Sequence, residues 1–146
     1  VFPLQKVAGK WRVHLIENWR IPVWRKVLEV PAGLAEIGST AEDNARREVL
    51  EEVGFRDVIL SKPSDRILGD PQRSTESAFV MFGLIDEKAQ REELALDEAE
   101  HIENIDFELE GNFLEKIEQT CVEKDLGIDA NLYMILSGLG WDQIYK

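Results

Sequence analysis

The sequence contains a single cysteine, Cys121, so the chain can form no internal disulfide bond. This scarcity is typical of proteins from a reducing compartment, and we expect a cytoplasmic location. No other cysteine or histidine lies near Cys121 at the spacing of a metal site, which indicates a structural thiol on a helix. Long apolar runs are also missing. The run SAFVMFGLI is too short to cross a bilayer, so we expect no membrane partner.

Basic residues are few. The chain has 17 Lys and Arg residues against 29 Asp and Glu residues, which gives a formal net charge of −12. Such a surface repels a phosphate backbone, so nucleic-acid polymers are poor partners. A small anionic substrate stays compatible with this charge if metal ions neutralise the site.

Internal repeats, low-complexity tracts and Gly/Ser linkers are absent from the sequence, and we expect a single domain over residues 1–146. The first residues, VFPLQKVAGKWRV, lack the pattern of a secretory signal. They also lack an initial methionine, from which we expect that the chain has been trimmed or processed.

Apolar periodicity predicts a mixture of strands and a few helices. Strands are predicted at 11–19, 25–30, 57–63, 77–86 and 101–109, with a turn at 20–24 and a glycine-rich loop at 31–39. Helices are predicted from Ser39 or Thr40 to Gly54, over 112–124 and over 129–141. This order of elements favours an α+β fold, an α/β/α sandwich, over a regular βαβ winding.

The stretch REVLEEVGF places three carboxylates close together on the first of these helices. Glu48, Glu51 and Glu52 fall within an arc of about 100°, and Val49 and Val53 lie on the far side. From helix geometry alone, an amphipathic helix with a solvated acidic face is the favoured interpretation. Like charges one turn apart destabilise a helix, however, and anions are unfavourable near its C-terminal end.

A tight glycine loop, PAGLAEIGS, precedes this helix and can bring the backbone close to a ligand. Clustered hard oxygen ligands on a rigid element suit Mg²⁺ or Mn²⁺, which also bridge phosphate oxygens. The residues therefore leave two interpretations open, a solvated acidic face and a divalent-metal site.

From Gly33 to Phe55 the chain resembles the signature of the Nudix hydrolases. That signature is Gly, five residues, Glu, seven residues, then Arg-Glu-aliphatic-any-Glu-Glu-any-Gly-aliphatic. Arg47, Glu48, Val49, Glu51, Glu52 and Gly54 stand at the required spacing. One position differs: Ser39 occupies the place of the first Glu, which in the family supports the metal ligands. Ser39 is predicted to cap the helix instead.

The similarity extends beyond the signature. ENWRIPVWRKVLEVPAG resembles a segment of the ADP-ribose pyrophosphatase branch, and GIDANLYMILSGLGW is similar to its final helix. The resemblance implies a Nudix fold with a loop-helix-loop catalytic motif. It also implies hydrolysis of a nucleoside diphosphate sugar, with ADP-ribose favoured. That branch usually forms homodimers, so a homodimer is a possible assembly.

Carried over by this resemblance, the metal ligands are Glu48 and Glu52, with Glu51 as a ligand or supporting group and the carbonyl oxygen of Ala32 as a further ligand. Arg47 would orient these carboxylates by ion pairing. Mg²⁺ is the implied ion, with Mn²⁺ as an alternative.

The resemblance places the general base in the acidic loop LDEAEHI, with Glu98 as the base and Glu100 as a further metal ligand. Asp97 and Glu103 remain alternatives under a shifted alignment, and an acidic surface loop without a role is also open.

Three residues are expected to bind substrate. Arg20 would contact a phosphate or the distal sugar, Trp19 would stack or line the pocket, and Arg73 is a phosphate candidate. Each also has an ordinary interpretation, namely a surface ion pair, rim packing and a solvated loop side chain. GDP- or UDP-sugars and a catalytically weak module that binds nucleotide sugars remain alternatives to ADP-ribose hydrolysis.

Overall fold

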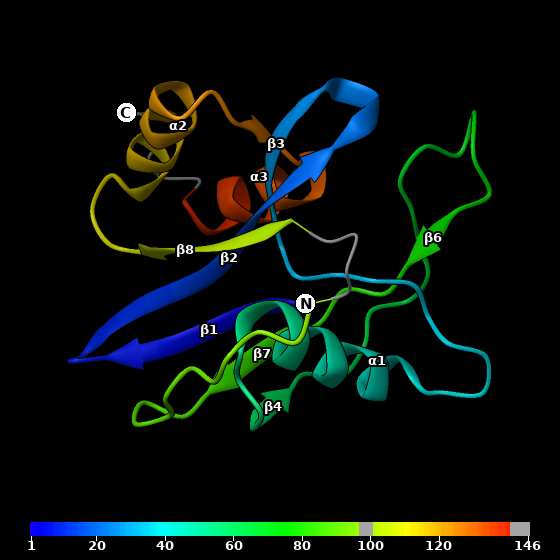
Figure 1. Cartoon of the computed structure of the whole chain (residues 1–146), viewed down its shortest axis with the longest axis horizontal. Helices are drawn as coiled ribbons and strands as arrows, with labels where there is room; N and C mark the ends of the chain where they lie inside the picture. Colours follow the sequence, from blue (N-terminus) through cyan, green and yellow to red (C-terminus); the bar gives the residue numbers. More distant parts are fainter. Residues whose placement is uncertain (97–100, 141–146) are drawn as a thin grey trace.

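The computed structural model describes residues 1–96 and 101–140. Within these residues a mixed sheet runs in the order β4-β7-β1-β2-β3-β9, and β8 pairs with β2 (Figure 1). The strands of this sheet are β1 (Phe2–Val7), β2 (Lys10–Arg20), β3 (Arg25–Glu29), β4 (Val58–Leu60), β7 (Phe82–Ile85), β8 (Ile102–Glu108) and β9 (Gly127–Ile128). A small separate ladder joins β5 (Ile67–Leu68) and β6 (Ser77–Ala78).

The long strand β2 organises the sheet. Strand β8 pairs with residues 12–18 of β2, and this range overlaps the stretches that pair with β1 and with β3. Since a strand has two edges, β1 and β3 share the edge opposite β8. They meet end to end there, where the backbone nitrogen of Val1 donates to the carbonyl oxygen of Pro31 at 2.8 Å. The loop that follows β3 therefore leaves the sheet beside the start of β1.

Helices cover both faces of the sheet (Figure 1). On one face, α2 (Phe113–Glu123) and α3 (Ala130–Leu139) pack on a core that includes Val13 and Leu15 of β2. On the other face, the helical segment made of α1 (Ala41–Glu48) and η2 (Val49–Val53) packs on a core that includes Ile16. Alternate residues of β2 thus serve opposite layers, and the expected α/β/α sandwich is confirmed.

Several predicted elements are confirmed with small shifts, including β2, β3, β8, α2 and α3. The strand predicted at 77–86 is wrong as one piece, because it divides into β6 and β7. Strand β1, which contains Pro3, was not predicted from the sequence. Pro3 aligns with Gly83 of β7, whereas the ladder from β1 to β2 begins only at Leu4. The proline lies beyond that ladder, so its missing N–H costs β2 no hydrogen bond.

The acid-bearing helix ends at the predicted residue but in a different geometry. Gly54 ends it in the left-handed conformation, with φ +79°. The last turn, η2, is a π-helix and not the α-helix that was expected. A π-turn inserts an extra residue into the helical repeat, so the angles expected for an α-helix do not hold for Glu51 and Glu52. Among the described residues, the structure contains no helix with the length and apolar character needed to cross a membrane.

Candidate active site

Hydrogen bonds connect the glycine-rich loop to the helical segment made of α1 and η2 (residues 41–53), which we call the acid helix. Thr40 is the N-cap of α1, and its Oγ1 accepts from the backbone N–H of Asp43 at 3.1 Å. Of the two caps predicted from the sequence, Thr40 is confirmed and Ser39 is wrong, since Thr40 is the residue in the extended conformation that caps require. Asn44 ties the loop to the helix, because its side chain donates to the Thr40 carbonyl and accepts from the N–H of Glu36.

Gly33 lies against the carboxylate of Glu48. A Cβ atom at position 33 would fall within 3.0 Å of Cδ, Oε1 and Oε2 of Glu48, closer than real Cβ atoms approach such groups. The φ angle of Gly33 is not positive, so the requirement for glycine here is one of space. Glu48 is 7 % exposed, and its carboxylate therefore faces the loop and not bulk solvent.

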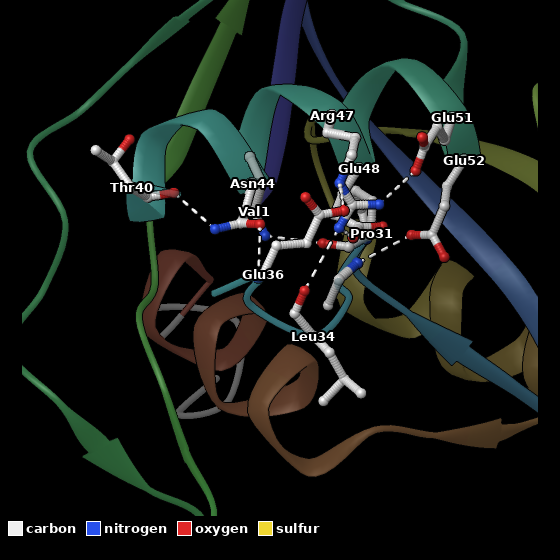
Figure 2. Close-up of polar contacts among 11 residues, drawn as sticks. Val1, Pro31, Leu34, Glu36, Thr40, Asn44, Arg47, Glu48, Glu51 and Glu52 are labelled. Atoms are coloured by element: carbon white, nitrogen blue, oxygen red, sulfur yellow. Dashed lines mark hydrogen bonds and ion pairs between the residues drawn. The ribbon is translucent and has the colours of Figure 1, made fainter. Parts of the chain in front are cut away.

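Arg47 lies between two of the three acids (Figure 2). Its Nη1 donates to Glu51 Oε2 at 2.6 Å, and its Nη2 donates to Glu48 Oε1 at 2.5 Å. The same guanidinium reaches back to the loop, where Nη2 lies 3.4 Å from the Leu34 carbonyl oxygen and Nε lies 3.5 Å from Glu36 Oε1. Burial lowers the pKa of Arg47, but the charges of Glu48 and Glu51 outweigh it and raise the pKa overall. The cation thus holds two carboxylates that would otherwise repel each other.

Glu52 is the most deeply buried of the three acids, at 3 % exposure. Its Oε2 accepts from the backbone N–H of Ala32 at 2.9 Å. Its backbone carbonyl accepts from Asn104 Nδ2 of β8 at 2.6 Å. The loop on one side and the sheet on the other therefore fix this residue through both its side chain and its main chain.

The buried carboxylates of Glu48 and Glu52 supply anionic oxygen atoms, which are the ligands that a hard cation needs. Over residues 1–96 and 101–140, no group of three or more Asp, Glu, His or Cys side chains is placed to hold a metal ion. In this conformation Arg47 engages Glu51 and Glu48. Mg²⁺ commonly binds through one or two carboxylates while water and substrate phosphates complete its shell, so Glu48 and Glu52 remain a suitable pair.

The expected substrate-binding residues do not converge in the structure. Arg20 forms a bidentate pair with Glu29, with Nε to Oε1 at 2.8 Å and Nη2 to Oε2 at 2.5 Å. Hydrogen bonding to Glu29 raises the pKa of Arg20, and the charge of Glu52 adds to the shift. Trp19 is half-exposed and alternates with Arg20 along β2, which places it on the sheet face away from the acid helix. Arg73 is exposed and pairs with Asp70 at 3.8 Å.

Of the four acids considered for the general base and the further metal ligand, the structure describes only Glu103. Glu98, Glu100 and Asp97 lie outside the described residues. Glu103 lies opposite Glu17 in the ladder between β8 and β2, so it faces the layer of α2 and α3. Its carboxylate pairs with Lys26 at 2.6 Å, and that hydrogen bond lowers its pKa. Glu103 is therefore turned away from the acids, and this alternative is not supported by the geometry.

Three residues that shape the site were not predicted from the sequence, namely Glu36, Asn44 and Asn104. Glu36 places a carboxylate oxygen 3.5 Å from Arg47 Nε, although the signature expects that acid at position 39. A signal for Asn44 was available, since an amide one turn after a cap can bond back to the cap carbonyl. The contact of Asn104 joins residues far apart in the sequence and has no local signal.

Comparison with known proteins agrees with this geometry. A family model described as the NUDIX domain matches residues 6–119. The putative nudix hydrolase 2 of Caenorhabditis elegans is 34 % identical over 98 residues, covering 65 % of this chain and 44 % of that protein. An ADP-ribose pyrophosphatase of Escherichia coli (strain K12) is 38 % identical over 79 residues, covering 51 % and 37 %. An ADP-ribose pyrophosphatase of Bacillus subtilis (strain 168) is 31 % identical over 108 residues, covering 71 % and 55 %.

The family match spans well over half of the chain, and Gly33, the arginine and the acids of the signature meet in one place in the structure. The chain belongs to the Nudix family. It spans between 37 % and 55 % of the length of the three relatives named above.

Proposed function

We propose that this chain hydrolyses the pyrophosphate bond of a nucleoside diphosphate sugar, with ADP-ribose as the favoured substrate and AMP and ribose 5-phosphate as products. The observation that carries the proposal is the placement of Glu48 against Gly33 and of Glu52 against the N–H of Ala32, with Arg47 joining Glu48 to Glu51. Membership of the Nudix family and relatives named ADP-ribose pyrophosphatase support the choice of reaction.

Glu48 and Glu52 would hold a divalent cation, Mg²⁺ or alternatively Mn²⁺, with Glu51, Glu100 and the carbonyl oxygen of Ala32 as further ligands. The two buried acids fit this role because their carboxylates are held by the loop and not dispersed in solvent. When bound, such a cation neutralises phosphate charge and makes bound water more acidic.

The other proposed roles do not involve holding the cation. Arg47 keeps Glu48 and Glu51 oriented while the substrate enters. Glu98 takes the proton of the attacking water, a bond forms between the water oxygen and one phosphorus, and the bond from that phosphorus to the bridging oxygen breaks. Arg20, Trp19 and Arg73 are the proposed substrate contacts. Arg20 would have to exchange its pair with Glu29 for a phosphate, or hold both.

A substrate panel tests the proposal. Purified protein is incubated with ADP-ribose, GDP-mannose and UDP-glucose at millimolar Mg²⁺, and the released nucleoside monophosphate is measured. We expect AMP release from ADP-ribose to be fastest. Equal or faster turnover of GDP-mannose or UDP-glucose would refute the choice of ADP-ribose, and no turnover of any of the three would refute the hydrolase.

Ser39 favours a second candidate function, a module that binds nucleotide sugars with weak catalysis. The signature Glu is missing there, and Glu36 approaches Arg47 only at 3.5 Å. Calorimetric titration of ADP-ribose beside a turnover assay separates the two functions. Tight binding without hydrolysis, unchanged by Ser39→Glu, would favour the module. A gain of turnover in Ser39→Glu would favour the enzyme.

Homodimer formation, a cytoplasmic location and a single domain over residues 1–146 remain predictions.

A further inference from the structure

The C-terminal end of the acid helix accepts hydrogen bonds from residues outside the helix. The last carbonyl groups of any helix lack partners within it and need other donors. In η2 and its cap, three such carbonyls have donors from distant parts of the chain. The pairs are Glu51 O with the N–H of Ala95 at 3.2 Å, Glu52 O with Asn104 Nδ2 at 2.6 Å, and Gly54 O with the N–H of Glu92 at 2.7 Å.

Two of these donors belong to one segment, residues 86–96, which passes directly over the helix end. This segment lies very close to Gly54, where a Cβ atom would lie 2.5 Å from the Glu92 carbonyl oxygen and 2.8 Å from Cγ of Arg91. Leu96 packs against the apolar cluster that contains Val49 and Val53 of η2. We call residues 86–96 the brace.

Arg91 fixes the middle of the brace to the sheet. Its Nη2 donates to Asp106 Oδ1 of β8 at 2.8 Å and lies 3.1 Å from His14 Nδ1 of β2. Its guanidinium carbon lies 5.4 Å from the centre of the Phe55 ring, directly after the helix cap. Arg91 therefore contacts the sheet and the helix end at the same time.

A buried polar cluster under Arg91 makes this anchor rigid. His14 is 2 % exposed, and its two ring nitrogens lie 2.8 Å from Asp106 Oδ1 and 3.2 Å from Gln5 Oε1. The Gln5 amide nitrogen donates to the carbonyl oxygens of Asp86 and Ala89 in the brace, at 2.8 and 3.3 Å. Strands β1, β2 and β8 therefore hold the brace at its start, and the brace holds the helix at its end.

We propose that Arg91 and Asn104 are positioning residues for the acids of the site, acting through the main-chain carbonyls of Glu51, Glu52 and Gly54. Neither residue touches the carboxylates in the contacts described above. Each fixes the turn from which Glu51 and Glu52 project, and metal ligands tolerate displacements of only about 0.5 Å. The functional part of this inference rests on the proposed metal-dependent hydrolysis.

The test measures metal binding apart from catalysis. Mn²⁺ is titrated into the substrate-free protein, and free Mn²⁺ is followed by electron paramagnetic resonance, for wild type, Asn104→Ala and Arg91→Met. Methionine keeps an apolar stem beside Phe55 but removes the donor to Asp106, so Arg91→Met offers a second variant if Asn104→Ala fails to fold. Lys124→Met is the matched control, because it removes a partner from the buried Glu17 on the opposite face of the sheet.

We expect the Kd for Mn²⁺ to rise about tenfold in Asn104→Ala and Arg91→Met, as for other residues that orient metal ligands indirectly, and to stay within about twofold of wild type in Lys124→Met. Wild-type Kd values in both site variants, measured while they are folded, would overturn the inference and leave the proposed function intact. A shift of equal size in Lys124→Met would also overturn it, since general loosening would then explain the effect. Failure of the wild type to bind Mn²⁺ would refute the proposed function itself.

Discussion

The carboxylate of Glu48 fills the space that a side chain at position 33 would need. Glycine at this position thus serves close approach and not an unusual backbone angle, because Gly33 has no positive φ. The loop can pass over the helix only while position 33 has no Cβ atom. Any other residue there must displace either the loop or the carboxylate of Glu48.

Gly33→Ala is therefore expected to disturb the site more than the fold. We expect kcat for ADP-ribose to fall about 100-fold, as when other contacts that orient a metal ligand are lost. Alanine also stiffens the unfolded chain, which offsets part of the strain, so Tm should change by only about 4 °C or less. Gly69→Ala is the control, since a Cβ atom there meets nothing within 4 Å. Full activity of Gly33→Ala would show that Glu48 does not need this position.

Arg47→Lys tests the ion pairs that join Glu48 to Glu51. A lysine ammonium is a single point charge and cannot reproduce the planar fork that reaches both carboxylates. We expect kcat at saturating Mg²⁺ to fall about 10- to 100-fold. The neighbouring Arg46→Lys is the control, because Arg46 donates to the Val58 carbonyl and not to an acid of the site. Equal kcat values for both variants would contradict the role assigned to Arg47.

Gly54→Ala tests the close contact between the helix cap and the brace. Position 54 has a φ of +79°, and a Cβ atom there would lie 2.5 Å from the Glu92 carbonyl oxygen. We expect the free energy of unfolding to fall by about 1–3 kcal/mol, because the strain of the left-handed conformation adds to the contact. Urea denaturation followed by circular dichroism measures this change. An unchanged midpoint would mean that the brace does not pack on the cap.

Asp106→Asn should change how stability depends on pH. Burial raises the pKa of Asp106, but hydrogen bonds and charge from His14 and Arg91 outweigh it and hold the pKa below its usual 3.8. The carboxylate therefore contributes stability that is fully present above pH 3.8 and is lost as the pH falls through the lower folded-state pKa.

Wild type should consequently lose stability relative to Asp106→Asn as the pH falls below about 3.8. Urea denaturation of both proteins between pH 3 and pH 7 measures the difference. Asp65→Asn, in an exposed loop, serves as the control. A stability difference between wild type and Asp106→Asn that stays constant over this range would contradict the assigned ion pairs.

Much of the site could be predicted from the sequence because its parts are local. Arg47, Glu48, Glu51 and Glu52 occur within one helical segment, so their spacing alone places them together. The cap residues and Gly54 have strong local preferences as well. The π-turn was not predictable from this pattern, since an apolar repeat of one turn fits either helical geometry.

The remaining features depend on contacts between distant segments. The cluster of Gln5, His14 and Asp106 joins three strands, and its members carry no signal in their own neighbourhoods. Asn104 reaches Glu52 across 52 positions of sequence. Such pairs arise from the order and register of strands, which one sequence does not specify. For the same reason the sequence did not show that Trp19 and the acid helix lie on opposite faces of the sheet.

Mn²⁺ titration of Glu52→Gln asks whether the buried acids of the helix bind a divalent cation. Glutamine keeps the size of the side chain and an oxygen for the N–H of Ala32, but it removes the charge. Glu42→Gln, on the first turn of the same helix, is the control. We predict that wild type and Glu42→Gln bind Mn²⁺ alike and that Glu52→Gln binds it at least about tenfold more weakly. Equal Mn²⁺ binding by Glu52→Gln and wild type would contradict the account.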